Sequence, residues 1–122
     1  MYKLLIVDDE QIEREGMAHF IQWDKYDIQL CGTAWNGADA LGKIQKDVPD
    51  IVLTDIKMPV MDGLEATRRI RLKGGTLPII ALTANAYDSD RDKAFEAGCD
   101  DYMAKPIMAP ALREMIKKYF GE

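Results

Sequence analysis

The segment DIVLTDIKMPVMDG, residues 50–63, joins a short apolar run to a polar loop. Residues 51–53 include two β-branched side chains, which is typical of a buried strand. Asp55 stands where this strand would leave the sheet, and the proline and glycine that follow it indicate a loop. Because aspartate is common in turns, the segment by itself favours an ordinary turn residue. The ends of the other predicted strands decide whether Asp55 has a further role.

Apolar periodicity divides the rest of the chain into alternating strands and helices. Four further strands are predicted at 3–7, 28–34, 78–82 and 101–104. Helices are predicted at 11–23, 38–46 and 64–73, from 88–90 to Gly98, and from a first turn that contains Pro110. We expect Ile12 to belong to the apolar stripe of the first helix, and Arg71 to lie on the solvated side of the third.

This alternation of strands and helices, joined by short loops, predicts a parallel sheet covered on both faces. Right-handed crossovers and a length of 122 residues favour an α/β, doubly wound (βα)5 fold of the flavodoxin-like type with strand order 2-1-3-4-5. We expect residues 1–122 to form one domain with no second, effector domain.

Composition excludes several classes of function. The chain has 21 acidic and 16 basic residues and a formal net charge of -5, which argues against direct binding of nucleic acid. The first ten residues predict neither a signal peptide nor a membrane span. Cys31 and Cys99 are expected to be reduced, buried or half-buried thiols of a cytoplasmic protein. One histidine, His19, and no cysteine cluster argue against a zinc site.

Polar side chains follow four of the five predicted strands. In chain order, these strand-end residues are Asp8 and Asp9, Asp55, Thr83, and Lys105. The carboxyl ends of parallel strands meet at one edge of a sheet, and ligands bind there at the point where the strand order reverses. That point lies between the first and third strands, so the three aspartates should flank one crevice.

Three crowded carboxylates repel one another, and a hard divalent cation such as Mg²⁺ relieves the repulsion. The hydroxyl of Thr83 and the ammonium of Lys105 are suited to neutralise a phosphoryl group. Asp55, central among them, is then placed to act as a nucleophile that forms an aspartyl phosphate. Each residue has an ordinary alternative, as a helix cap, a turn residue or a surface lysine. Five compatible groups on one edge favour the shared site.

These residues lie in the motifs VDDE (7–10), DIVLTDIKMPVMDG (50–63), ALTA (81–84) and DDYMAKP (100–106). Over its whole length the chain resembles the receiver domain of two-component response regulators, the family of the chemotaxis response regulator. The resemblance implies that Asp55 accepts a phosphoryl group from the phosphohistidine of a sensor histidine kinase or phosphotransfer protein. It also implies that Asp8, Asp9, Asp55 and the backbone carbonyl of Lys57 hold Mg²⁺.

The resemblance further implies that Thr83 and Lys105 contact the phosphoryl oxygens, with Lys57 and the amide of Ala84 beside them. Tyr102 matches the family's aromatic switch residue, although the sequence alone would favour an ordinary half-buried strand tyrosine. The switch would alter the surface of the last two helices and the last strand, and so a downstream effector. The Lys105-Pro106 bond would be cis. Such a domain catalyses its own phosphorylation and dephosphorylation without being a turnover enzyme, and needs no membrane.

The two halves of the chain resemble different receivers. Up to about Leu64 the sequence resembles receivers of response regulators that carry an AraC-type DNA-binding domain. From about Ala66 onward it resembles receivers of hybrid histidine kinases. We therefore hypothesise a natural mosaic or an engineered chimera joined near the third helix.

The residues after the first strand also distinguish the chain from two other classes of protein. Phosphatases of the haloacid dehalogenase group carry D-x-D after the first strand, where this chain has Asp8-Asp9-Glu10. An FMN binder of the same topology would need a hydroxyl- and glycine-rich loop at that place. The acids in this position favour the phosphoryl acceptor over both.

Overall fold

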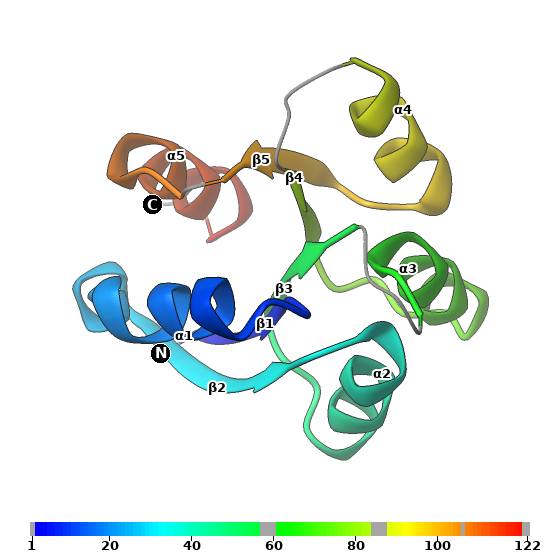
Figure 1. The fold of residues 1–122 in the computed structure, drawn as a ribbon, viewed down its shortest axis with the longest axis horizontal. Coiled ribbons are helices and arrows are strands. Elements are labelled where there is room, and N and C mark those ends of the chain that lie inside the picture. Colours follow the sequence, from blue (N-terminus) through cyan, green and yellow to red (C-terminus); the bar gives the residue numbers. More distant parts are fainter. Residues whose placement is uncertain (1, 57–60, 84–87, 106, 121–122) are drawn as a thin grey trace.

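Strands and α-helices alternate along the chain (Figure 1). The computed structural model describes residues 2–56, 61–83, 88–105 and 107–120. The elements in these ranges are β1 (Tyr2–Val7), α1 (Gln11–Phe20), the 3₁₀ helix η1 (Trp23–Tyr26), β2 (Ile28–Ala34), α2 (Gly37–Lys46), β3 (Ile51–Asp55), α3 (Gly63–Leu72), β4 (Ile79–Thr83), α4 (Asp88–Ala97), β5 (Asp101–Ala104) and α5 (Ala109–Phe120). Each predicted strand and helix is present.

The five strands form one sheet in the order β2-β1-β3-β4-β5, and every neighbouring pair is parallel. This confirms the predicted doubly wound fold and its strand order. The register aligns Val7 of β1 with Thr54 of β3. Because the two strands run in the same direction, the residues that follow this pair, Asp8 and Asp55, lie side by side at the carboxyl ends of β1 and β3.

Helices cover both faces of the sheet: α1 and α5 lie on one face, and α2, α3 and α4 lie on the other (Figure 1). The strand side chains alternate between two cores, as the period of two in a strand requires. In β1, Leu4 and Ile6 pack with α5, whereas Leu5 and Val7 pack with α2, α3 and α4. All four are at most 2% exposed, so β1 is buried on both faces.

The first helix is shorter than predicted. It ends at Phe20, because Ile21 adopts an extended backbone, and Trp23 begins η1 instead of continuing α1. Trp23 is buried, and its indole Nε1 donates to the carbonyl oxygen of Met17 at 3.0 Å. The prediction for Ile12 was wrong, since its side chain is 87% exposed. Five residues make about 1.4 helical turns, so the face that packs Met17 against the core turns Ile12 outward.

One cysteine also differs from the prediction. Cys99 is buried as expected, but Cys31 is exposed. The register between β1 and β2 shifts there, since Leu4 pairs with Leu30 and Leu5 pairs with Gly32. Cys31 is the extra residue at this irregularity on an edge strand, which explains its exposure.

Arg71 was expected on the solvated side of α3, and this prediction was wrong. Its Nε donates to the carbonyl of Gly98 at 2.9 Å, and its Nη1 donates to the carbonyls of Gly75 and Leu77 at 3.0 and 2.9 Å. Its Nη2 reaches Asp100 Oδ2 at 2.7 Å. Gly98 has a φ of 108°, a left-handed conformation that suits the end of a helix. Arg71 therefore ties the end of α3 to the segments before β4 and β5.

Replacing Arg71 with lysine should lower the free energy of unfolding by about 1–3 kcal/mol, because a lysine ammonium cannot reproduce the planar fork that reaches these acceptors. Urea denaturation would measure the change. Arg68→Lys is the matched control, since Arg68 is exposed and its ion pair with Glu65 is long, at 3.9 Å. It should change stability by less than about 0.5 kcal/mol. Equal effects of the two substitutions would contradict the role given to Arg71.

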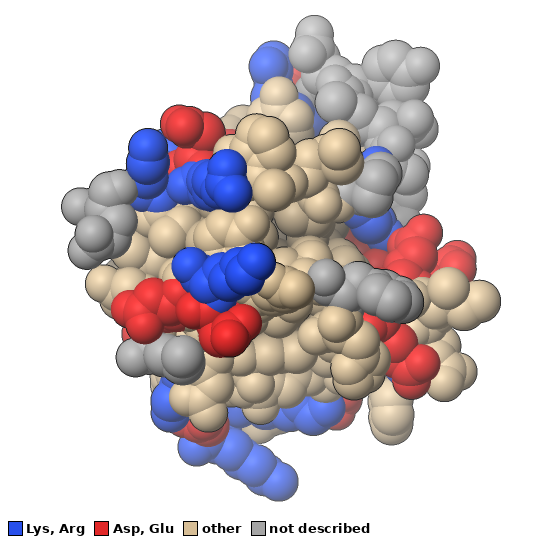
Figure 2. All heavy atoms as spheres, turned by 90° about the vertical axis from the view of Figure 1, so that its left-hand side faces the viewer, with Lys and Arg blue, Asp and Glu red and all other residues tan. Residues whose placement is uncertain are grey.

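Two observations concern the surface. Among the described residues, no helix is long and apolar enough to cross a membrane. Basic and acidic side chains are interspersed on the face in Figure 2, which views the molecule from the α1 and α5 side.

Candidate functional site

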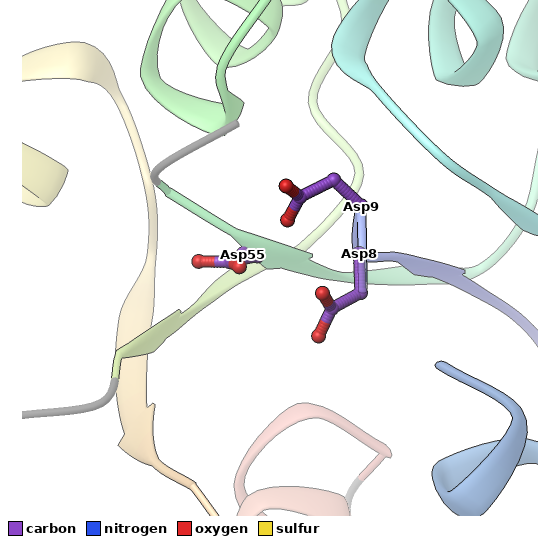
Figure 3. A group of neighbouring side chains, drawn as sticks. All are labelled: Asp8, Asp9 and Asp55. Carbon is purple, nitrogen blue, oxygen red and sulfur yellow. The ribbon is translucent and has the colours of Figure 1, made fainter. Parts of the chain in front are cut away.

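Three carboxylates converge at the carboxyl edge of the sheet. Asp8 and Asp9 follow β1, Asp55 ends β3, and the three side chains lie around one space (Figure 3). One oxygen from each lies within 4.8 Å of the others. Asp8 is fully buried, Asp55 is 9% exposed and Asp9 is half-buried. The structure thus brings together the three aspartates expected at the point where the strand order reverses.

Asp8 is held by contacts to its backbone and its side chain. Its N–H donates to the carbonyl of Ala34 at 3.0 Å, and its own carbonyl accepts from Arg14 Nη1 at 3.0 Å. Its Oδ1 accepts from the N–H of Glu10 at 3.0 Å. Asp8 therefore lies in the turn between β1 and α1, as its ordinary alternative expected, but the N-cap residue of α1 is Glu10, which has no side-chain cap hydrogen bond. Oδ2 of Asp8 accepts from Lys105 Nζ.

Lys105 follows β5 and extends its ammonium between these acids. Nζ lies 3.0 Å from Asp8 Oδ2 and 3.3 Å from Asp55 Oδ2. Its shortest contact is 2.6 Å, to Oε2 of Glu13. Burial of the side chain opposes the charged form, but the hydrogen bonds to Glu13 and Asp8 outweigh it and raise the pKa of Lys105. Lys105 therefore keeps its positive charge beside these acids at neutral pH.

Glu13 is the residue of this cluster that the sequence analysis missed. It lies in the first turn of α1, where an acidic side chain is favoured by the helix dipole. The hydrogen bond from Lys105 lowers the pKa of Glu13. The strand-end argument could not find it, because it comes from a helix. An acid in the first turn after Asp8 and Asp9 was the available signal.

Thr83 and Tyr102 lie on β4 and β5, the two strands that follow β3 in the order of the sheet. Thr83 ends β4, is 4% exposed, and its carbonyl accepts from the N–H of Lys105 at 2.8 Å. The ends of β4 and β5 are thereby joined. Tyr102 is half-buried, and its ring is perpendicular to that of Phe95 with centroids 6.2 Å apart. The predictions for Lys57, Ala84 and the Lys105-Pro106 bond fall on residues 57, 84 and 106, outside the described residues.

Gly63 fixes the return of the chain beside Asp55. A Cβ at Gly63 would lie 2.4 Å from the carbonyl oxygen of Asp55 and 2.7 Å from Thr54 Oγ1. Asp62 caps α3, since its Oδ1 accepts from the N–H of Glu65 at 2.8 Å. The start of α3 is thus packed directly against the backbone of the central acid.

This set of groups fits a hard divalent cation. Mg²⁺ prefers oxygen ligands at about 2.0–2.1 Å, so that opposite ligands are about 4 Å apart, and it keeps several waters. Carboxylate oxygens within 4.8 Å of one another meet this need with small adjustments or through a bridging water. Lys105 supplies a further positive charge beside them. With a cation bound, the site could therefore neutralise the negative charge of a phosphoryl group.

Comparison with known proteins matches the chain to receiver domains. The family profile of the response regulator receiver domain matches residues 4–117. Sensor histidine kinase RcsC of Salmonella typhi is 40% identical over 116 residues, which cover 95% of this chain and 12% of the kinase. Response regulator MprA of Mycolicibacterium vanbaalenii is 39% identical over 116 residues, which cover 95% of this chain and 48% of that protein. The chain therefore spans about half or less of these relatives.

A solved structure of similar fold carries a metal ion at its site. It is the receiver domain of a sensor histidine kinase from Pseudomonas aeruginosa, described with a magnesium ion coordinated in the active site cleft. It is 31% identical to this chain, with a TM-score of 0.84 and coverage of 99% of this chain and 98% of that one.

Proposed function

The chain belongs to the family of response regulator receiver domains of two-component signalling, and from this membership we propose that Asp55 is its phosphoryl acceptor. The observation that carries the proposal is the convergence of Asp8, Asp9 and Asp55 beside the ammonium of Lys105. We also propose that residues 1–122 fold as one receiver domain and that it works in the cytoplasm.

A carboxylate oxygen of Asp55 attacks phosphorus, and the bond from phosphorus to the donor breaks as the leaving group takes its electron pair. Asp8 and Asp9 need not act as acids or bases, because phosphoryl transfer depends mainly on positioning and charge stabilisation. Together with Asp55 and, by family analogy, the backbone carbonyl of Lys57, they would hold Mg²⁺. When bound, the metal offsets the negative charge that the acids and the phosphoryl oxygens bring together.

Lys105 neutralises one phosphoryl oxygen, and the hydroxyl of Thr83 donates to another. By family analogy, Lys57 and the amide of Ala84 would contact the same group. Thr83 is buried at the end of β4, so its movement toward the phosphoryl group would open space on the side of Tyr102. Tyr102 then turns inward and alters the surface of α4, β5 and α5 by favouring one of two conformations.

The natural phosphodonor is a phosphohistidine on a sensor histidine kinase or phosphotransfer protein, and the altered surface acts on a downstream effector. Family membership supports both partners, and the relatives are themselves a response regulator and a sensor kinase. The domain promotes its own phosphorylation and dephosphorylation and is not a turnover enzyme. The mosaic origin of its two halves remains a hypothesis.

The test is phosphorylation by a small donor, acetyl phosphate or phosphoramidate, with and without Mg²⁺. With Mg²⁺, intact-protein mass spectrometry should detect the gain of one phosphate. Borohydride reduction followed by peptide mapping should locate it on Asp55. Chelation of the metal with EDTA should prevent the gain, because the crowded carboxylates would repel the anionic donor. Incorporation at another residue, or equal incorporation after chelation, would refute the proposal.

A further inference from the structure

The ammonium of Lys105 contacts three carboxylates, one for each of its three N–H donors. An ammonium group has three hydrogens, and Nζ contacts Glu13 at 2.6 Å, Asp8 at 3.0 Å and Asp55 at 3.3 Å. The lysine side chain is 14% exposed and that of Asp8 is fully buried. The ammonium is therefore held within the crevice and fully used by the acids around it.

Two of these three partners have a second use. Asp8 and Asp55 belong to the group of oxygens that could hold a cation, whereas Glu13 does not. The ammonium and a divalent cation therefore compete for the same two carboxylates. Glu13 is the partner that can hold the lysine without giving up a metal ligand, and its contact is the shortest of the three.

We propose that Glu13 is a positioning residue that acts through Lys105. It draws the ammonium toward α1, which leaves the oxygens of Asp8 and Asp55 available to a divalent cation, and it keeps Lys105 in the crevice once the cation is bound. This inference rests on the proposed function, since the cation is the one that phosphorylation requires. It adds a residue from α1 to a site otherwise built at strand ends.

An exposed ion pair is the ordinary alternative for Glu13, whose side chain is 47% exposed. Such pairs contribute little on their own. The contact differs from them because its lysine is largely buried and shared with Asp8 and Asp55. When Glu13 is lost, the ammonium has no other described carboxylate than these two, and it must then oppose cation binding directly.

Because the ammonium and the cation compete, loss of Glu13 should lower the affinity for Mg²⁺. Glu13→Gln should weaken Mg²⁺ binding by about three- to tenfold, because Lys105 then pairs only with carboxylates that the cation also needs. Glu13→Asp keeps the charge and should recover part of the affinity. Glu15→Gln is the matched control: it removes the same charge two residues along α1, where Glu15 contacts Gln11.

The decisive experiment is a double-mutant cycle read by isothermal titration calorimetry with Mg²⁺ alone, without a phosphodonor. In a Lys105→Met background, adding Glu13→Gln should change Mg²⁺ affinity by less than about twofold, since the residue through which Glu13 acts is absent. Circular dichroism would verify that each variant is folded. If Lys105→Met does not fold, Lys105→Gln takes its place in the cycle.

The outcomes separate this inference from the proposed function. If the unmodified protein binds Mg²⁺ and Glu13→Gln binds it equally well, the inference fails while the metal site stands. If Glu13→Gln weakens binding to the same extent with and without Lys105, the effect is a direct one of charge, and the inference also fails. If the unmodified protein binds no Mg²⁺, the proposed metal site fails and the inference fails with it.

Discussion

Asp55→Asn is expected to abolish phosphorylation of the chain by acetyl phosphate or phosphoramidate in the presence of Mg²⁺. The substitution replaces a carboxylate by an amide of nearly the same shape, which removes the nucleophilic oxygen and one negative charge of the metal site. Asp55 is 9% exposed and forms the end of β3. No side chain in the described strand-end cluster is equally central, so none should replace it. Intact-protein mass spectrometry would detect the loss.

The control is Asp92→Asn, the same chemical change at an exposed position of α4. It should leave phosphorylation unchanged. Asp55→Asn should remain folded, as circular dichroism would verify, because the amide keeps the volume of the side chain and relieves repulsion with Asp8 and Asp9. Phosphate uptake by the folded Asp55→Asn variant at the rate of the unmodified protein would show that the acceptor lies elsewhere.

The second large effect is expected from Gly63→Ala, which should lower the free energy of unfolding by about 3 kcal/mol. The added methyl group would lie 2.4 Å from the carbonyl oxygen of Asp55 and 2.7 Å from Thr54 Oγ1. The carbonyl belongs to the backbone of a buried central strand and cannot swing aside, so α3 or the end of β3 must move. Urea denaturation would measure the loss.

Gly42→Ala is the matched control for this substitution. It lies inside α2, and an added Cβ there would meet nothing within 4 Å. Alanine is the better helix former, so this variant should be more stable by about 0.5–1 kcal/mol. The two substitutions should thus differ in sign. A Gly63→Ala protein as stable as the unmodified one would mean that the close contact with Asp55 can relax without cost.

Much of the fold could be predicted because its signals are local. Apolar runs bounded by prolines and glycines define the strands, and the alternation of strands and helices defines the topology. The errors arose where a distant partner decides the outcome. Arg71 shares a helix with exposed arginines, but its acceptors include the carbonyls of Gly98 and Leu77. Local periodicity cannot reveal such partners.

The candidate site was predictable to the extent that it is built at strand ends. The parallel topology brings Asp8, Asp9, Asp55 and Lys105 to one edge, as the general rule for such sheets requires. Glu13 could not be reached by that rule, because a helix delivers it and only the direction of its side chain links it to Lys105.

Lys105 and Arg71 each link segments that are distant in the sequence, at opposite edges of the sheet. At the carboxyl edge, Lys105 of the second half contacts acids of the first half. At the amino edge, Arg71 links α3 to the segments before β4 and β5, all within the second half. Three of the four acceptors of Arg71 are backbone carbonyls, whose charge neither a metal nor a phosphoryl group alters. All three acceptors of Lys105 are carboxylates. The contacts of Arg71 should therefore be unaffected by a metal ion or phosphoryl group at the site. The contacts of Lys105 should change directly when either one binds.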